Sequence, residues 1–222
     1  MTDTFEPHYE TLPKSQLSLL PLLSPLRELH FTLYGGTALV LRLGHRVSVD
    51  FDFFSHLSIS SEKELAGRLP FLSNSRIIQR AVNTLTYVTH DGVKLSFFGG
   101  IGYGRLGKTE ITQDGILNVA STIDLMSTKL AALVQRLEAK DYIDIHALIN
   151  SGESLMKGLC GVCTLFGDSM PPMEIARALT CFQGGDLHVL SEEVKSGLLR
   201  AAQGLVFSEI GPMPLASKKL DG

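Results

Sequence analysis

Residues 47–54, VSVDFDFF, alternate between apolar side chains and polar or acidic ones up to the last position. A period of two residues is typical of a half-buried β-strand, because successive side chains point to opposite faces. We therefore expect Val49 and the phenylalanines two and four positions after it to face a core. Asp50 and Asp52 would share the other face, about 7 Å apart along the strand. The stretch is also rich in β-formers, which favours the same interpretation.

The elements around this strand predict an α/β (α+β) fold, in which helices flank a mixed β-sheet and a helical part follows. In the first half we expect strands at 30–34 and 47–54, a short helix that ends at Gly44, a helix at 61–69 opened by Ser60 or Ser61, and strands within 76–100 with a hairpin turn at Asp91-Gly92. In the second half we expect helices at 122–138, 140–150, 153–166, 172–181 and 191–206. The predicted division is an α/β core over 1–120 and a helical part over 121–222 that packs on it.

The bulk composition excludes several classes of protein. The formal net charge is −3, which does not indicate a strongly basic nucleic-acid binder. The N-terminus lacks the basic and apolar segments of a secretory signal, and the proline-broken run LSLLPLLSPL is shorter than the ~20 residues that span a bilayer. Three cysteines give no even disulfide framework, and Cys160 and Cys163 form only half of a zinc motif. We expect a cytoplasmic protein with reduced thiols.

Gly35 and Gly36 lie upstream of the two aspartates, separated from them by the predicted helix and a turn. Glycines let a backbone approach a ligand closely, and the free N–H groups of a helix N-terminus favour anions. Two nearby carboxylates suit Mg²⁺, which completes its coordination with water and substrate phosphates. The stretch therefore predicts a site for a metal-bound polyphosphate.

Other interpretations of this stretch remain open. An Asp-x-Asp pair is common in loops and at helix starts. The stretch is not an EF-hand, because Ser55 and Ser61 stand where that loop needs Gly and Glu, and neither a dinucleotide fingerprint nor a P-loop is present. His45 and Arg46 could form a solvated turn, or they could reach a triphosphate.

The second half carries a charged pattern in STIDLMSTKLAALVQRLEAKDYIDIHAL. A core-facing stripe is expected from Ile123, Met126, Leu130, Leu133 and Leu137. A neighbouring stripe of cations around a small residue would consist of Lys129, Ala132, Arg136 and Lys140, and a solvated basic face would look the same. Asp141 and Asp144 share one helix face; Asp141 could simply complement the helix dipole, and Asp144 could pair with Lys129 or Arg136.

These features, in this order, resemble the nucleotidyltransferase toxins of the AbiEii/AbiGii type, which occur in type IV toxin–antitoxin and phage-defence systems and include the MenT toxins. The first matching motif is Gly35-Gly36 followed by Asp50-Phe51-Asp52. The second is Asp124, Lys129 and Ala132, with the spacing Asp-x4-Lys-x2-Ala. The third is Arg136 followed by KDYID at 140–144.

The resemblance implies a DNA-polymerase-β-like core and Mg²⁺-dependent (or Mn²⁺-dependent) transfer of a nucleoside monophosphate from an NTP to an acceptor. That acceptor is tRNA in the MenT relatives, and a cognate antitoxin is an expected partner. The implied catalytic residues are Asp50, Asp52, Lys129 and Asp144, of which Asp50 and Asp52 hold metal. The residues implied to bind the nucleotide and its phosphates are Gly35, Gly36, Thr37, Arg46, Ser48, Lys129, Arg136 and Asp141.

The sequence departs from the family pattern at three positions. Gly36 replaces a serine, and Lys140 replaces an arginine before Asp141. Many enzymes of the superfamily carry a third carboxylate on a later strand, where the expected residue here is Ser96. These departures keep two rival functions open: transfer to a protein or small molecule, and an inactive nucleotide-binding or partner-binding module.

Overall fold

The computed structural model describes residues 3–59 and 61–221. Contacts within the chain divide it into two units. The first unit comprises the residues up to 104, residues 108–120 and the residues from 217 onward. The second comprises residues 105–107 and 121–216. Each unit therefore contains segments that are distant in the sequence.

The first unit is built on a mixed sheet whose strand order, among the described residues, is β1-β7-β8-β2-β3-β6-β5-β4. The strands are β1 (Thr4–Phe5), β2 (Thr32–Tyr34), β3 (Asp50–Phe54), β4 (Arg76–Ala81), β5 (Thr84–Val88), β6 (Lys94–Phe98), β7 (Glu110–Thr112) and β8 (Asn118–Val119). Strand β3 runs antiparallel to β2 and parallel to β6. Its neighbours on both sides confirm that the chain has an α/β fold with an interior carboxylate strand.

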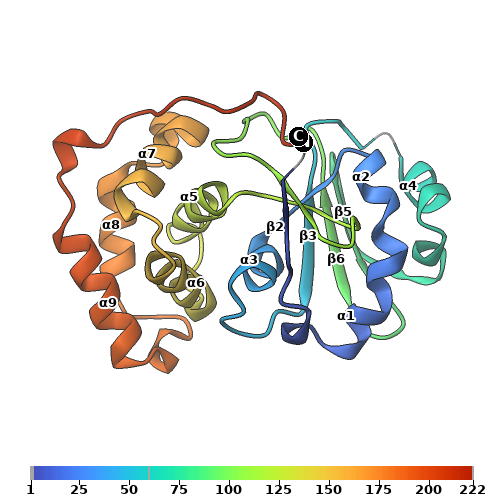
Figure 1. Ribbon diagram of the computed structural model, residues 1–222, viewed down its shortest axis with the longest axis horizontal. Coiled ribbons are helices and arrows are strands. Elements are labelled where there is room, and N and C mark those ends of the chain that lie inside the picture. Colours follow the sequence, from blue (N-terminus) through green and yellow to red (C-terminus); the bar gives the residue numbers. More distant parts are fainter. Residues whose placement is uncertain (1–2, 60, 222) are drawn as a thin grey trace. The chain divides into compact units, whose positions relative to one another are not determined.

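Helices cover the sheet of the first unit. They are α1 (Lys14–Leu19), α2 (Pro25–Glu28), α3 (Gly35–Leu43) and α4 (Glu62–Arg68). Figure 1 shows α3 on one side of the strands and α1 and α2 on the other. Ser61 caps α4 by accepting a hydrogen bond from the Glu64 amide, as the sequence predicts, whereas the alternative cap, Ser60, lies outside the described residues.

Helix α3 is fixed to the sheet by burial and by one arginine. Leu39, Val40 and Leu41 have no exposed surface, and the helix ends, as predicted, at Gly44 in a left-handed conformation. The guanidinium of Arg42 donates to the carbonyl oxygens of Ala120 (2.9 Å) and Val119 (3.2 Å) and also contacts Glu110. These bonds tie the last turn of α3 to β7 and β8, and so hold the whole helix in register with the strands.

The carboxylate strand is shorter than the sequence pattern predicts. It begins at Asp50, and Val49 is 58% exposed rather than packed in a core. Strand β6 provides the reason, because its first residue, Lys94, pairs with Asp50 and leaves no partner for the preceding residues. The expectation for Val49 was therefore wrong, whereas Phe51 and Phe53 are buried as expected.

The hairpins are also more numerous than predicted. The turn at Asp91-Gly92 joins β5 to β6, and Gly92 adopts a φ of +78°. A second tight turn joins β4 to β5 at Val82 and Asn83, where Asn83 adopts a φ of +56°. The sequence analysis did not separate β4 from β5, because Val-Asn is a weaker turn signal than Asp-Gly.

The second unit is helical. Its helices are α5 (Thr122–Ala132), α6 (Ala139–Asn150), α7 (Leu155–Phe166), α8 (Pro172–Thr180) and α9 (Glu192–Gln203). Helix α5 packs against α6 and α7, and α9 packs against α6 and α8. Glycines in α7 let this helix pack closely against α5, since a Cβ at Gly161 would lie 2.1 Å from Ser127 Oγ. No helix among the described residues combines the length and apolar character needed to cross a bilayer.

Two predicted helices were too long: the helix predicted at 191–206 ends at Gln203, and the one predicted at 122–138 differs more. Helix α5 ends at Ala132 instead of continuing to 138, so Arg136 and Lys140 do not share a stripe with Lys129. Leu137 also leaves the expected apolar stripe and is 41% exposed, although Met126, Leu130 and Leu133 are buried. The second half of the cation stripe therefore belongs to the loop before α6 and to α6 itself.

Candidate active site

Asp50 and Asp52 project from the same face of β3, as the alternation predicts. The intervening Phe51 and the following Phe53 are buried on the other face, with at most 1% of their surface exposed. In the register of the parallel pair, Asp50 lies opposite Lys94 and Asp52 opposite Ser96 on β6. The strand pairing therefore places four side chains in a two-by-two array on one face of the sheet.

Lys94 is a member of this array that the sequence analysis missed. Its Nζ lies 3.4 Å from Asp50 Oδ2. The side chains of Lys94 and Asp50 are 42% and 31% exposed, so solvent and substrate can reach the pair. Only the register between β3 and β6 reveals the contact, and a register cannot be read from either strand alone.

Ser96 occupies the position where the sequence analysis looked for a third carboxylate. It is 3% exposed and pairs through its backbone with Asp52 on one side and Thr86 on the other. The sequence analysis named Ser96 as the position for a third carboxylate, and the strand pairing places it directly opposite Asp52. The strand next to the aspartates contributes a hydroxyl and an ammonium group at these positions, and no acid.

Gly35 leaves room for the Asp52 carboxylate. Its φ is +70°, a backbone conformation that favours glycine. A Cβ at this position would lie 2.6 Å from Asp52 Oδ2, well inside van der Waals contact. The first glycine of the motif is therefore required both by its own backbone and by the carboxylate beside it.

The second glycine stands at the centre of a polar cluster. A Cβ on Gly36 would lie 2.6 Å from Arg46 Nη2 and 3.2 Å from Ser48 Oγ. Thr37 Oγ1 lies 2.9 Å from Ser48 Oγ and also contacts the carbonyl oxygen of Asp50. The structure thus brings the predicted phosphate-binding residues of the first unit together at the N-terminus of α3, next to the carboxylate strand.

The remaining predicted residues form an ion network in the second unit, in which Arg136 is half exposed and the other members are buried. Lys129 Nζ lies 2.7 Å from Asp141 Oδ1 and 2.7 Å from Asp144 Oδ2, and neither carboxylate is exposed. Arg136 donates from Nε and Nη2 to the two oxygens of Asp141, at 2.8 and 3.2 Å. Of the two partners that the sequence analysis left open for Asp144, the structure shows Lys129, and Asp141 is more than a complement to the helix dipole.

The positive charges in this network lower the pKa of Asp141. Burial alone would raise the pKa of Asp141, but the ammonium of Lys129 and the guanidinium of Arg136 outweigh burial and hold that pKa below its usual range. Asp141 is therefore ionised at neutral pH. Removing one partner of such a network would leave a buried charge uncompensated.

Asp124, the first residue of the second motif, is buried and holds neighbouring backbone in place. It is 1% exposed, and its carboxylate accepts hydrogen bonds from the amides of Leu106 (2.7 Å) and Gly107 (3.1 Å) and from the hydroxyl of Ser121. Ser121 in turn caps α5 by accepting from the Asp124 amide. Burial is the main cause that raises the pKa of Asp124. The residue holds the segment 105–107 against the start of α5.

The donor set of the carboxylate array fits a divalent cation. Asp50 and Asp52 offer hard oxygen ligands of the kind that Mg²⁺ takes from proteins. Within the described residues no group of three or more His, Cys, Asp or Glu side chains could hold a metal ion. The first unit would therefore supply two carboxylates and leave the other coordination positions to water or substrate.

Comparison with known proteins identifies the family to which the chain belongs. The family model described as nucleotidyl transferase AbiEii toxin, type IV toxin–antitoxin system, matches residues 22–159, which include the aspartates of β3 and the network of α5 and α6. The chain belongs to this AbiEii family. The resemblance stated from the three sequence motifs is thereby confirmed.

One relative of this AbiEii protein and one solved structure illustrate the range of similarity. An uncharacterized protein of Aquifex aeolicus (strain VF5) is 35% identical over 120 residues, which are 54% of this chain and 57% of that protein. The chain thus spans little more than half the length of that relative. The solved structure of MenT4, a nucleotidyltransferase toxin of Mycobacterium tuberculosis H37Rv, matches with a TM-score of 0.50 and 14% identity over 86% of this chain and 83% of that one, which shows a shared fold.

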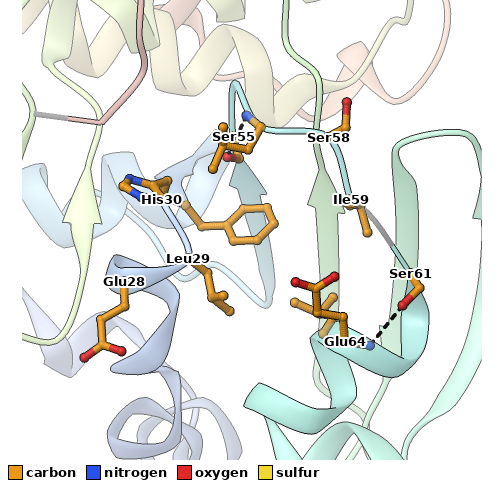
Figure 2. Close-up of a pocket in the computed structure, with 11 residues that line it drawn as sticks. Glu28, Leu29, His30, Ser55, Ser58, Ile59, Ser61 and Glu64 are labelled. Carbon is orange, nitrogen blue, oxygen red and sulfur yellow. Dashed lines mark hydrogen bonds between the residues drawn. The ribbon is translucent and has the colours of Figure 1, made fainter.

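A separate pocket of the first unit lies at the far end of β3. Its volume is 210 Å³. Ser55, which follows the last residue of β3, lines it together with Phe31 and Ile59, and Figure 2 shows the carboxylates of Glu28 and Glu64 at its margin. None of the predicted site residues lines this pocket. This pocket is therefore distinct from the cluster that Asp50 and Asp52 form with the N-terminus of α3.

Proposed function

We propose that this AbiEii protein is a nucleotidyltransferase that moves a nucleoside monophosphate from an NTP to an acceptor RNA, tRNA being the acceptor to test first. One observation carries the proposal: two carboxylates share a face of β3 beside the glycine-rich N-terminus of a buried helix. Such a helix end binds phosphate through its free N–H groups, and adjacent carboxylates hold the cation that accompanies a triphosphate.

In this proposal Asp50 and Asp52 hold Mg²⁺, or Mn²⁺ in its place. When bound, the cation supplies charge neutralisation for the triphosphate. Gly35 and Gly36 let the phosphates approach the backbone of α3. The guanidinium of Arg46 and the hydroxyl of Ser48, both close to Gly36, add hydrogen-bond donors on the same side.

The reaction is a displacement at the α-phosphorus. The oxygen of an acceptor hydroxyl forms a bond to the α-phosphorus, the bond from that phosphorus to the bridging oxygen breaks, and pyrophosphate leaves with the electron pair. The hydroxyl proton passes to water. The resemblance implies phosphate binding by Lys129 and Arg136 and an acid role for Asp144, but Lys129 and Asp144 are buried against each other, 2.7 Å apart. We therefore assign to their network, which includes Asp141, the fixing of charges within the second unit.

The setting of the reaction follows from its substrates. NTPs and RNA are cytoplasmic, and we propose the same location for this protein. Membership of a type IV toxin family supports a toxic activity that a cognate antitoxin opposes. The formal net charge of −3 means that an RNA acceptor would need a local basic surface.

The test is transfer of label from each α-³²P NTP, with Mg²⁺, into total RNA and total protein of a host cell. The expected result is label in a discrete RNA band. Asp52→Asn should abolish it while leaving the fold intact, because the amide keeps the size of the carboxylate and loses its charge. Asp91→Asn is the matched control, since Asp91 lies 72% exposed in the β5–β6 turn.

Each other outcome of this experiment has a definite meaning. Label that enters only protein, or a small molecule, would keep the transferase and replace the acceptor. A folded protein that binds no NTP and transfers no label would show that the chain is an inactive binding module. Label that persists in Asp52→Asn would show that the carboxylate array does not carry the reaction.

A further inference from the structure

The contact between Lys94 and Asp50 has no place in the function proposed above. The two residues are directly opposite one another on neighbouring parallel strands, and Lys94 Nζ lies 3.4 Å from Asp50 Oδ2. The ammonium group therefore lies beside an oxygen of one of the two carboxylates proposed to hold the cation. Strand register places the backbones of the two residues opposite each other, so the ammonium is within reach of the carboxylate.

The contact matters because it changes the net charge of the array. Two carboxylates face one ammonium and one buried hydroxyl, that of Ser96. The array therefore carries one formal negative charge, where two aspartates alone would carry two. A divalent cation is attracted less strongly to such a site, because Lys94 already neutralises one of its ligands.

The lysine side chain can leave this position when a better anion arrives. Its ammonium is a compact charge on a flexible four-carbon stem with three hydrogen-bond donors. The pair is open to solvent, with 42% of Lys94 and 31% of Asp50 exposed. A triphosphate carries several negative charges in one place and competes well with a single half-exposed carboxylate.

We infer that Lys94 is a positioning residue that couples nucleotide binding to metal binding. Without nucleotide its ammonium pairs with Asp50 and weakens metal binding at the array. When a triphosphate binds at the N-terminus of α3, the ammonium moves from Asp50 to a phosphate oxygen, and the released carboxylate becomes a full ligand for the divalent cation. This inference rests on the proposed function, because it takes the nucleoside triphosphate as the anion.

The test measures Mn²⁺ binding by electron paramagnetic resonance, with and without each of the four α,β-methylene NTP analogues, which cannot release pyrophosphate. In Lys94→Met we expect Mn²⁺ to bind about threefold to tenfold more tightly than in the wild type when nucleotide is absent. We expect the analogue to strengthen Mn²⁺ binding in the wild type and to have little such effect in the variant. Without metal, the analogue itself should bind about tenfold more weakly to Lys94→Met.

Two further variants control the measurement. Lys63→Met removes the same charge from an exposed position of α4 in the same unit and should behave as the wild type. Lys94→Arg retains the charge and should restore nucleotide binding relative to Lys94→Met. A purely structural role for Lys94 would change the melting temperature of Lys94→Met and leave the linkage between Mn²⁺ and nucleotide as it is in the wild type.

The outcomes separate this inference from the proposed function. If the wild type binds Mn²⁺ and an analogue together, but Lys94→Met has the same Mn²⁺ affinity without nucleotide, only the role of Lys94 is wrong. If the folded wild type binds neither Mn²⁺ nor any analogue, the proposed function fails and the role of Lys94 fails with it. Tighter Mn²⁺ binding and lost linkage in Lys94→Met alone among the methionine variants would establish the coupling.

Discussion

The Asp52 carboxylate lies in the space that a side chain at Gly35 would fill, 2.6 Å from the position of its Cβ. Gly35→Ala should therefore lower the free energy of unfolding by about 1–2 kcal/mol from its positive φ alone, and it should also displace Asp52. The matched control is Gly92→Ala, which has a similar φ of +78° and no atom within 4 Å of the added methyl. Urea unfolding should show a loss in both variants, and NTP binding should fall only in Gly35→Ala. Equal NTP binding in the two variants would contradict the role assigned to this contact.

Lys129 neutralises two carboxylates that have no exposed surface. Lys129→Met should cost about 3–5 kcal/mol of stability, because it leaves buried charge uncompensated. Lys140→Met is the control: Lys140 is 47% exposed and pairs with Glu138 at 2.8 Å, so its loss should cost less than about 1 kcal/mol. Chemical unfolding of the two variants measures the difference, and a similar small loss in both would show that the network is not a stability element.

The network also predicts a dependence of stability on acid. The pKa of Asp141 is lowered in the folded state, against burial, by Lys129 and Arg136. Folding therefore gains stability from the ionised carboxylate above its unfolded pKa of about 3.9, and the gain is lost as the pH falls through the lower folded pKa. Urea unfolding between about pH 6 and about pH 2.5 should show this loss, and Arg136→Met should reduce its size. A variant with the full acid dependence of the wild type would exclude Arg136 as a cause.

Asp124 accepts from two backbone amides and one hydroxyl, so its carboxylate cannot be replaced by an amide of the same shape. Asp124→Asn would point an NH₂ group at a buried N–H donor and should cost about 1–3 kcal/mol. Asp168→Asn, at an exposed position of the second unit, should be nearly neutral. Thermal unfolding compares the two, and an Asp124→Asn protein as stable as the wild type would show that the segment 105–107 is held by other contacts.

Ser96→Asp would place the absent acid opposite Asp52. Without metal, the added buried carboxylate should lower the melting temperature, because two like charges would lie side by side in a site that is 3% exposed. Added Mn²⁺ should restore much of that loss by binding only the folded protein. Ser96→Asn has the same size without the charge, and its melting temperature should not respond to Mn²⁺ beyond the wild-type response. A metal-insensitive Ser96→Asp would argue against an ion at this face.

The sequence analysis predicted the features of the fold that depend on local periodicity. Alternation located β3 and the shared face of Asp50 and Asp52, and the glycine after a run of helical spacing located the end of α3 at Gly44. It failed at Val49 because a strand extends only as far as its partner, and the partner strand begins at Lys94. The helix predicted at 122–138 was too long, because the apolar spacing continues past Ala132 whereas the backbone leaves the helix there.

The candidate site was predictable where it depended on motifs and not where it depended on register. The aspartates and the glycines were named from their spacing, and Lys129 was one of two partners considered for Asp144. Lys94 was missed, because a lysine in a β-hairpin is ordinary until the neighbouring strand is known to be β3. The structural task of Asp124 was missed as well, since its partners lie in the segment 105–107 and the contact is not local.

The last residues of the described chain contribute to the first unit. Leu220 has no exposed surface, Thr109 donates to its carbonyl oxygen at 2.8 Å, and Asp221 contacts His30 and His56. During synthesis from the N-terminus, the ribosome must therefore make the entire helical unit before the first unit can finish its own packing. The first unit can therefore become fully folded only after residue 221 has been added, long after the ribosome has made its carboxylate strand.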